Sequence, residues 1–312
     1  MEKILFKSVR FSFRTIMSLL IATILLGVSP VAAGAGGTGD TGKNDTPGDS
    51  ILSTMSQAQI QDLAERYSPI WFIAKSDPYP PMPVEDYVEN SCIKDRTRDD
   101  ELLRFPIGEV DLSLLSRYSY RSVPSISVKR AFELQYNCDQ HWEDFPSINW
   151  RTETSVFANV SPRDGGGFSI QYWVFYGYNP PSHDADWESV TISFSRKGNP
   201  RQIAYSAHGH LSVGNWWETN KEGTNTQVLV ANGGHGNSPV SNTADSSYTQ
   251  WRRAKIEVMT DNQGDILQDY RWIAYKGEWG TKGIITSPAH QREQWNWPDP
   301  PDESGILRFS NN

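Results

Sequence analysis

Residues 172–194, YWVFYGYNPPSHDADWESVTISF, decide how the rest of the chain is interpreted. Two apolar, aromatic-rich runs flank a Pro-Pro turn and a group of acidic and imidazole side chains. Side chains at i, i+2 and i+4 of a strand share one face, so Asp184, Asp186 and Glu188 are expected in one row that Val190 continues. Unpaired buried carboxylates are very costly. We therefore expect these acids to lie at the solvent end of the strand, to accept several hydrogen bonds, or to hold a cation.

The N-terminus has the pattern of a secretory signal peptide. Four basic residues precede an apolar run at 16–28, and Val31-Ala32-Ala33 fits a signal peptidase site. The run is shorter than the roughly 20 residues that a membrane-spanning helix needs, and no later stretch approaches that length. Residues 1–33 are therefore predicted to be removed on export. The product would be secreted, periplasmic or extracellular, with no transmembrane segment after cleavage.

The charge of the chain limits its partners. The full sequence carries a formal net charge of -8, and residues 1–33 contain four basic residues and one acid, a net of +3. Cleavage would therefore leave a charge of -11. An acidic surface of this size argues against nucleic acid, and against anionic lipid, as electrostatically driven partners.

The exported part is interpreted as a linker and one domain. Residues 34–52 are rich in Gly, Thr, Asp and Ser without apolar periodicity, which predicts a flexible linker. Residues 53–312 are assigned to a single β-sandwich domain. The only two cysteines, Cys92 and Cys138, fall in this domain, and an oxidising compartment favours a disulfide between them. Two free buried thiols remain the alternative.

The pattern along the domain predicts a mainly β fold. Ser56 and Gln59 form a capping box before a short amphipathic N-terminal helix, and residues 70–73 have the length and composition of a strand. From Thr152 onward, short β-like runs alternate with Gly, Pro, Asn and Ser turns at intervals of roughly 10 to 20 residues, which is typical of an antiparallel, jelly-roll-like β-sandwich. The tail, 287–301, is expected to be irregular.

Four of the six histidines fall at predicted strand ends or turns. His183 lies beside the acids, and His208 and His210 are expected to share a strand face. Together with the three carboxylates they form a candidate metal site, whose members are His183, Asp184, Asp186, Glu188, His208 and His210. The oxygen-rich donor set favours Ca, Mg or Mn over a closed structural Zn site. The alternative is a polar plug in which the imidazoles and acids pair with each other and with turn amides.

The aromatic residues suggest a ligand surface. Twelve Trp in 312 residues is high, and core packing is the ordinary explanation. Trp216 and Trp217, in a loop rich in Gly and Asn, are the pair we expect to stack on a sugar or a membrane interface. Trp187, within the acidic group, and His235, in a Gly-Gly-His-Gly turn, complete the candidate ligand-binding residues.

Several motifs resemble proteins related to vacuolar protein sorting protein 62. They are AERYSPIWF at 64–72, VEDY at 84–87, YWVFY at 172–176, DWE at 186–188, YSAH at 205–208 and YKGEWG at 275–280. They occur in the family's order over residues 60 to about 297. This family has no settled biochemical activity, so the resemblance implies a fold more than a function.

The acidic stretch also resembles the signature of the necrosis-inducing, NPP1-like proteins, Gly-His-Arg-His-Asp-Trp-Glu. Here 182–188 reads SHDADWE, and 206–209 reads SAHG. The resemblance implies that His183, Asp186 and Glu188 hold a divalent cation in a sandwich that engages sphingolipid sugar heads and damages membranes. Asp184 replaces the family's Arg and Ala185 its second His, and both changes weigh against cytolytic activity.

Three functional hypotheses follow. The first is a secreted protein that binds a divalent cation and a glycan or lipid headgroup, with a toxin or virulence role. The second is a metal-dependent hydrolase of glycans or phosphoesters with Glu188 or Asp184 as general base; nucleophilic catalysis is not favoured because the chain has no Gly-x-Ser-x-Gly motif. The third is a non-catalytic surface or scaffold protein.

Overall fold

The computed structural model describes residues 50–95, 102–119, 132–136, 138, 150–180, 183–240, 246–252, 254–280 and 285–291. All of them belong to one unit of the chain, Asp45–Asn312. The predicted signal peptide and all but the end of the predicted linker lie outside these residues. Among the residues that the structure describes, no helix is long and apolar enough to cross a membrane.

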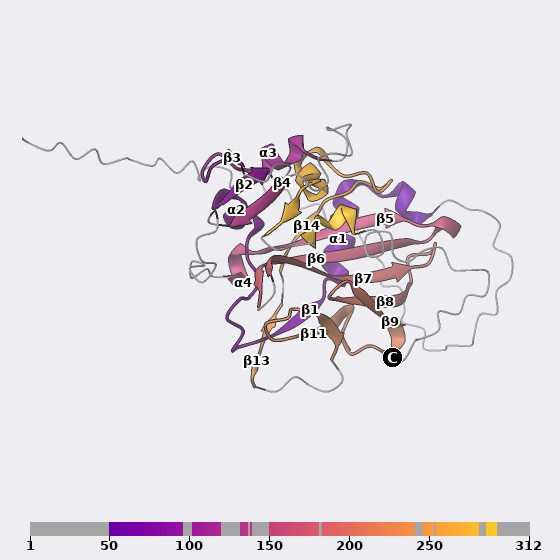
Figure 1. Ribbon diagram of the computed structural model, residues 1–312. Helices are drawn as coiled ribbons and strands as arrows, with labels where there is room; N and C mark the ends of the chain where they lie inside the picture. Colours follow the sequence, from indigo (N-terminus) through magenta and orange to yellow (C-terminus); the bar gives the residue numbers. More distant parts are fainter. Residues whose placement is uncertain are drawn as a thin grey trace, which may run out of the picture. The chain divides into compact units, whose positions relative to one another are not determined.

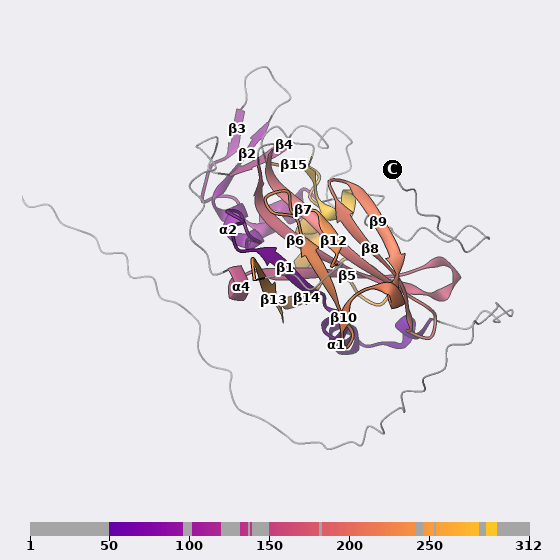
Figure 2. The same ribbon diagram turned by 90° about the horizontal axis from the view of Figure 1, so that it is seen from below.

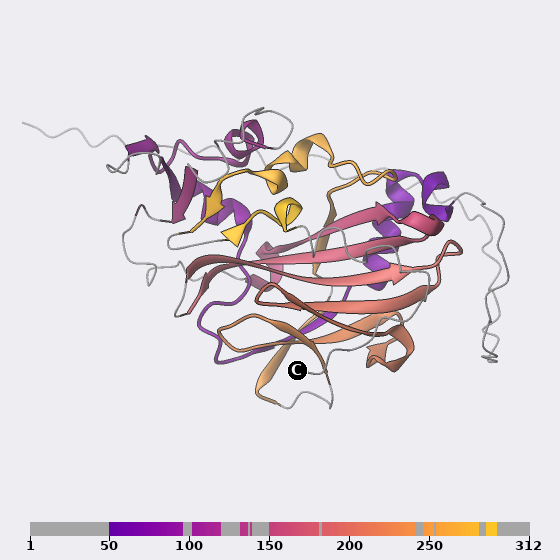
Figure 3. The same cartoon turned by 45° about the vertical axis from the view of Figure 1, so that its right-hand side comes forward.

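A central sheet of six strands is built around one long hairpin (Figures 1 and 3). Its two arms are β6 (Phe168–Asn179) and β7 (His183–Phe194), paired from Phe168 opposite Phe194 to Asn179 opposite His183. Every residue of β6 is buried, which requires cover on both faces of the sheet. The full order is β14 (Lys255–Val258), β5 (Ser155–Pro162), β6, β7, β8 (Pro200–Ala207) and β9 (His210–Asn215).

Two further sheets supply that cover. In Figure 1 one of them lies below the central strands and the other above them. The first contains β10 (Lys221–Glu222), β11 (Asn225–Val230), β1 (Ile70–Ala74) and β13 (Tyr248–Trp251), with β12 (Asn237–Pro239) paired to β11. The other contains β16 (Ile285–Thr286), β15 (Glu278–Trp279), β4 (Phe132–Tyr136), β2 (Ser91–Asp95) and β3 (Leu102–Phe105).

Strand alternation divides the apolar residues of the central hairpin between two cores. Tyr172 and Val190 face a first core that also contains Trp71 of β1. Trp173 and Trp187 point to the opposite face, into a second core that contains Trp279 of β15. Because successive side chains of a strand point to opposite faces, one hairpin can serve both cores.

Short helices close the edges of these layers (Figure 2). The predicted N-terminal helix is confirmed as α1 (Gln57–Tyr67), with both hydrogen bonds of the capping box at Ser56. Before it, Leu52 of η1 (Ile51–Thr54) is fully buried, so the prediction of a linker reaching residue 52 is wrong at its end. The others are α2 (Val84–Glu89), α3 (Leu112–Arg117), α4 (Trp150–Glu153), η5 (Asp164–Gly166), η6 (Trp216–Glu218), η7 (Gln268–Ala274) and η8 (Pro288–His290).

The mainly β, sandwich-like prediction is confirmed, with two corrections. A jelly-roll-like sandwich has two sheets, whereas the described residues of this chain form three. The pairing is not purely antiparallel, because β1–β11, β14–β5 and β15–β4 run parallel. Parallel pairs need crossover connections, and these give the chain its long-range connectivity. Of the predicted irregular tail, the structure describes residues 287–291, which include the short helix η8.

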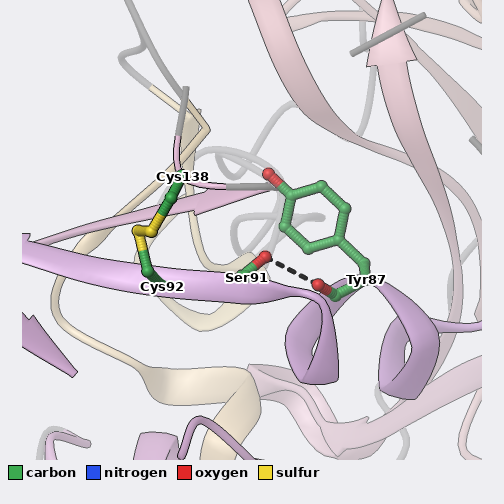
Figure 4. The surroundings of a disulfide bond; sticks show 4 residues. All are labelled: Tyr87, Ser91, Cys92 and Cys138. Atoms are coloured by element: carbon green, nitrogen blue, oxygen red, sulfur yellow. Dashed lines mark hydrogen bonds between the residues drawn. A yellow bond between two sulfur atoms is a disulfide. The ribbon is translucent and has the colours of Figure 1, made fainter. Parts of the chain in front are cut away.

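The predicted disulfide is confirmed. Cys92 in β2 is bonded to Cys138, which follows β4, the strand paired with β2 (Figure 4). Next to Cys92, the Ser91 hydroxyl donates a 2.6 Å hydrogen bond to the Tyr87 carbonyl of α2. The disulfide therefore crosslinks two segments of the third sheet. It does not involve the central hairpin, which is stabilised by packing.

Removing the crosslink should lower stability measurably. The bond spans a sequence separation of 46 residues, and closing a loop of that length contributes about 4 kcal/mol in the chain-entropy model. We expect the double variant Cys92→Ala, Cys138→Ala to lose about 2 to 4 kcal/mol in urea unfolding. Reduced wild-type protein is the matched control and should show a similar loss. A difference below about 1 kcal/mol would show that the loop is constrained by other contacts.

Candidate functional site

Asp186 and Glu188 lie next to each other on one face of β7. They pair across the hairpin with Tyr176 and Val174, which face the first core, and their exposed fractions are 5% and 1%. The prediction that these two acids enter an apolar row is therefore confirmed. Asp184 is set apart from them by Ala185, whose φ of 57° interrupts the regular strand, and it packs against Gly280. A Cβ at Gly280 would overlap the backbone oxygen of Asp184, so only glycine fits there.

The carboxylate of Glu188 is held by the neighbouring strand. The Ser206 hydroxyl of β8 donates a short hydrogen bond to one oxygen, and the His208 backbone N–H donates to the other at 2.9 Å. Ser206 in turn accepts the Ser189 N–H at 2.6 Å. Both oxygens of this buried carboxyl group therefore have protein donors, which offsets part of the cost of burying it.

His235 is the cation of the site. Its Nδ1 lies 3.4 Å from Asp186 Oδ2, and its Nε2 lies 3.8 Å from Asp77 Oδ2, which makes the second contact an ion pair rather than a hydrogen bond. The ring stacks on Tyr176 at a centroid distance of 4.0 Å. We call Asp77, Asp186, Glu188 and His235 the acidic cluster.

The parallel pair β1–β11 brings Asp77 and His235 together. Ile70 lies opposite Gln227, so both strands leave the sheet at the same edge. Asp77 follows the end of β1, and His235 follows the end of β11. The Gly233 N–H then donates to Asp77 Oδ2 at 3.2 Å, which joins the two segments directly.

The His235 turn sits tightly against the central sheet. A Cβ at Gly236 would lie 2.9 Å from the Ala207 Cβ, and one at Gly234 would lie 3.4 Å from the His208 ring. His235 itself has a φ of 55°, an uncommon conformation for a residue with a side chain. The glycines on either side of His235 therefore let the turn approach closely enough to place the imidazole among the carboxylates.

The charges of the cluster depend on one another. Burial raises the pKa of Glu188, and the Asp186 carboxylate adds to this, giving a pKa of about 8. Burial lowers the pKa of His235, but its contacts with the Asp186 and Asp77 carboxylates outweigh burial and raise the pKa to about 9. Burial raises the pKa of Asp77, while its contacts with His235 and two backbone N–H groups lower it overall. At neutral pH the protonated imidazole and the protonated Glu188 are both favoured.

The remaining predicted metal ligands lie around this cluster rather than in it. His183 is half-buried, with Nδ1 2.8 Å from the Ala185 carbonyl. The expectation that His208 and His210 share a strand face is wrong. β8 ends at Ala207 and β9 begins at His210, and His208 with Gly209 forms the connecting turn, both with positive φ. A two-residue hairpin with this geometry is a common connection, so the spacing of the histidines reflects a turn.

The described residues contain no group of three His, Cys, Asp or Glu side chains set up to hold a metal ion. Two buried polar atoms in or beside the cluster nevertheless lack a hydrogen bond. In the described part of the chain, the buried Tyr176 hydroxyl and His235 Nε2 have no hydrogen-bond partner. Orphaned polar atoms of this kind are rare in protein interiors and mark places where a further group fits.

The three tryptophans predicted to bind a ligand do not line the cluster. Trp187 is 2% exposed and points into the second core, with its ring centroid 4.8 Å from Phe175, so its assignment as a ligand-binding residue is corrected. Trp216 packs on Tyr67, which also contacts Phe194 at the far end of β7. Eight residues of strand separate Asp186 from Phe194, about 26 Å at roughly 3.3 Å per residue. Trp217 is 65% exposed beside Trp216, so this pair and the cluster are separate surfaces.

Asp77 was not identified from the sequence. It lies in a Pro-rich turn more than a hundred positions from Asp186, and no local pattern distinguishes it from an ordinary turn residue. The only usable signal is that an acid closely follows an apolar strand. That signal becomes informative only when the parallel neighbour β11 is known.

Replacing His235 should destabilise the protein strongly. The variant His235→Ala would leave Asp77 and Asp186 buried without their cation, and breaking a buried ion pair in this way typically costs about 3 to 5 kcal/mol. Urea unfolding measures the loss. His210→Ala is the matched control, because His210 is exposed, and it should change stability by less than about 0.5 kcal/mol. Equal effects of the two substitutions would contradict the central position of His235.

In metal-free protein, stability should fall as the pH rises from about 5 to about 9. The pKa of His235 is raised from 6.5 to about 9, so its contribution is complete below pH 6.5 and is lost through pH 9. The pKa of Glu188 is raised from 4.5 to about 8, so folding becomes less favourable as the pH rises through that interval. Urea unfolding in EDTA at several pH values tests this. Glu188→Gln should show a shallower dependence, and a stability that rises with pH would contradict both assignments.

Comparison with known proteins gives only distant likenesses. No family model matches the chain, and no curated protein matches it. Among solved structures, NLPPya in complex with glucosamine has 11% sequence identity and a TM-score of 0.39, with 68% of this chain and 77% of that chain covered. NLPPya in complex with mannosamine has 14% identity and a TM-score of 0.31, with 39% and 56% covered.

A third structure is Necrosis and Ethylene inducing Protein 2 from the causal agent of cocoa's Witches Broom disease. It has 13% identity and a TM-score of 0.31, with 39% of this chain and 57% of that chain covered. These proteins belong to the necrosis-inducing family whose signature residues 182–188 resemble. None of the comparisons supports the resemblance to vacuolar protein sorting protein 62-related proteins. The functional proposal therefore rests on the residues of this chain.

Proposed function

We propose that the protein is a secreted sandwich protein whose acidic cluster binds a divalent cation and, through it, a glycan or lipid headgroup. The observation that carries the proposal is an excess of buried carboxyl groups. Asp77 and Asp186 contact one imidazole, and the Glu188 carboxyl group lies close enough to interact electrostatically with both Asp186 and that imidazole, which balances a single negative charge when protonated. Buried charges in proteins are paired or coordinate metals. A divalent cation would provide the missing positive charge and allow Glu188 to ionise.

The donor chemistry favours a hard ion. The proposed ligands are the carboxylate oxygens of Asp77, Asp186 and Glu188 together with the nearby Tyr176 hydroxyl, and this set is rich in oxygen. Such ligands suit Ca, Mg or Mn, while Zn prefers imidazole and thiolate. Because the His208 N–H donates to Glu188 and the His208 side chain is exposed, His208 is the residue that would face a bound headgroup.

A toxin or virulence role is the further part of this proposal. Its support is the resemblance of residues 182–188 to the necrosis-inducing signature. Asp184 and Ala185 depart from that signature, and Ala185 adopts a left-handed conformation that separates Asp184 from the cluster. The cation-binding and cytolytic parts are therefore tested separately, the second by leakage of sphingolipid-containing vesicles.

Calorimetric titration with Ca, Mg, Mn and Zn tests cation binding. We expect wild-type protein to bind at least one of the first three ions, and Asp186→Asn to weaken binding about tenfold or more, because it removes a charged ligand. Asp62→Asn, at an exposed position of α1, is the matched control and should bind like wild type. No heat with any ion, or equal binding by both variants, would leave the cluster as a structural plug. Glucosamine and mannosamine are suitable sugar probes once an ion binds.

Metal-dependent hydrolysis is the second candidate. The observation in its favour is Glu188, whose pKa of about 8 suits a general acid or base near neutral pH. A screen of generic phosphoester and glycoside substrates with the cation present would detect it. Activity that is lost in Glu188→Gln while the ion still binds would support hydrolysis, and a blank screen would leave binding as the function.

A further inference from the structure

One edge of the central sheet has no strand beside it. The sheet ends at β14 on one side and at β9 on the other, and Figure 2 shows β9 outermost, next to β8. β9 pairs with β8 from His210 opposite Ala207 to Asn215 opposite Gln202. Along its other side, no group in the described part of the chain forms a hydrogen bond with the β9 backbone. An edge strand of this kind can pair with a further strand.

The register shows which backbone groups of β9 point outward. A two-residue turn joins β8 to β9, so Ala207 and His210, which flank the turn, form a hydrogen-bonded pair. Hydrogen-bonded and non-hydrogen-bonded pairs alternate along an antiparallel ladder. The N–H and C=O groups of Leu211, Val213 and Asn215 therefore point away from β8, toward the free edge.

The opposite edge of the same sheet is protected. β14 carries Lys255 and Glu257, and α1 packs against it, with the Gln61 side chain donating to the Ile256 carbonyl at 2.8 Å. Charged side chains and a covering helix are ordinary means of blocking a sheet edge. By contrast, residues 210–215 of β9 read HLSVGN, without Lys, Arg, Asp, Glu or Pro, and their register with β8 contains no bulge. β9 therefore lacks the sequence features that prevent strands from pairing edge to edge.

We propose that β9 is a dimerisation edge, which pairs antiparallel with β9 of a second copy of this chain. A two-fold axis at Val213 places this residue opposite its own copy and Leu211 opposite Asn215. The outward N–H and C=O groups of each pair then satisfy each other. The two six-stranded sheets would join into one continuous sheet. Because the strand has no acidic, Lys or Arg side chain, the pairing brings no such like charges face to face.

The surroundings of β9 favour a second copy as the partner. Trp217 follows β9 closely and is 65% exposed, and the two-fold arrangement would place it beside the Gly209 turn of the other copy. A Cβ at Gly209 or Gly214 would meet no atom within 4 Å, which leaves room on this side. Leu211 and Val213 are half-buried on one face of β9, and their copies would extend that apolar row. Symmetric pairing therefore uses the free backbone groups and also covers apolar surface of both copies.

Sedimentation velocity over a concentration series, in EDTA to exclude association through a cation, tests the dimer. We expect wild-type protein to associate reversibly, because pairing of one edge strand buries less area than a permanent interface. Val213→Lys places two like charges opposite each other at the axis and should weaken association about tenfold or more. Ala58→Lys adds the same charge at an exposed position of α1 and should associate like wild type. Thermal melting checks that both variants fold.

Two further variants test the register itself. Val213→Glu alone should also weaken association, and mixing it with Val213→Lys should restore association, because opposite charges then meet at the axis. Val213→Cys changes the side chain less. The Cα atoms of a hydrogen-bonded pair lie about 5.5 Å apart, which is within disulfide range, so oxidation should crosslink two copies of this variant. Ala58→Cys is the matched control and should not crosslink.

Wild-type protein that remains monomeric up to about 1 mM, the weak end of the affinity scale, would overturn the proposal and leave the edge to a different partner. A dimer that Val213→Lys leaves unchanged would also overturn it, because the two copies would then meet through another surface. Failure of both the charge mixing and the Val213→Cys crosslink would contradict the antiparallel register centred on Val213.

Discussion

The two buried carboxyl groups of β7 are the constraint on which most of the surrounding structure depends. The central sheet is covered on both faces, so water cannot solvate Asp186 and Glu188. The Ser206 hydroxyl and the His208 N–H donate hydrogen bonds to Glu188. The Asn179 amide donates a hydrogen bond to Asp186 at 2.9 Å, and His235 forms an ion pair with the same carboxylate. These groups come from β8, β6 and the turn after β11. A carboxylate buried without them would cost several kcal/mol, so the cluster can exist only where these segments meet.

Much of this arrangement was predictable from local patterns. The capping box at Ser56, the disulfide and the placing of Asp186 and Glu188 in one buried row follow from short-range rules of spacing and compartment. The same strand parity also places Trp187 on the opposite face, because it lies between two residues that point to the first core. Trp187 was assigned as a ligand-binding residue because it lies within the acidic motif. Strand alternation instead predicts that its side chain points into the second core, as the structure shows.

The rest of the site depends on contacts that no local pattern contains. Asp77 meets His235 because β1 and β11 pair in parallel, and antiparallel pairing was expected throughout. His208 and His210 were assigned to one strand because the spacing of two suggested it, whereas a left-handed His-Gly turn satisfies that spacing equally well. Trp216 and Trp217 were grouped with His235 as candidate ligand-binding residues, whereas the register of β8 and β9 places this pair at the other end of the sheet.

The parallel pair β1–β11 also affects how the chain reaches this state. Ile70 and Gln227 are separated by most of the domain, so their pairing requires closure of a very long loop. The chain loses conformational entropy when this loop closes, before the new contacts can stabilise it. Folds with many contacts between residues distant in sequence therefore fold slowly. The His235 ion pairs cannot form until that closure is complete. They therefore depend on this long-range pairing, and a chain that has collapsed without it would lack the His235 ion pairs with Asp77 and Asp186.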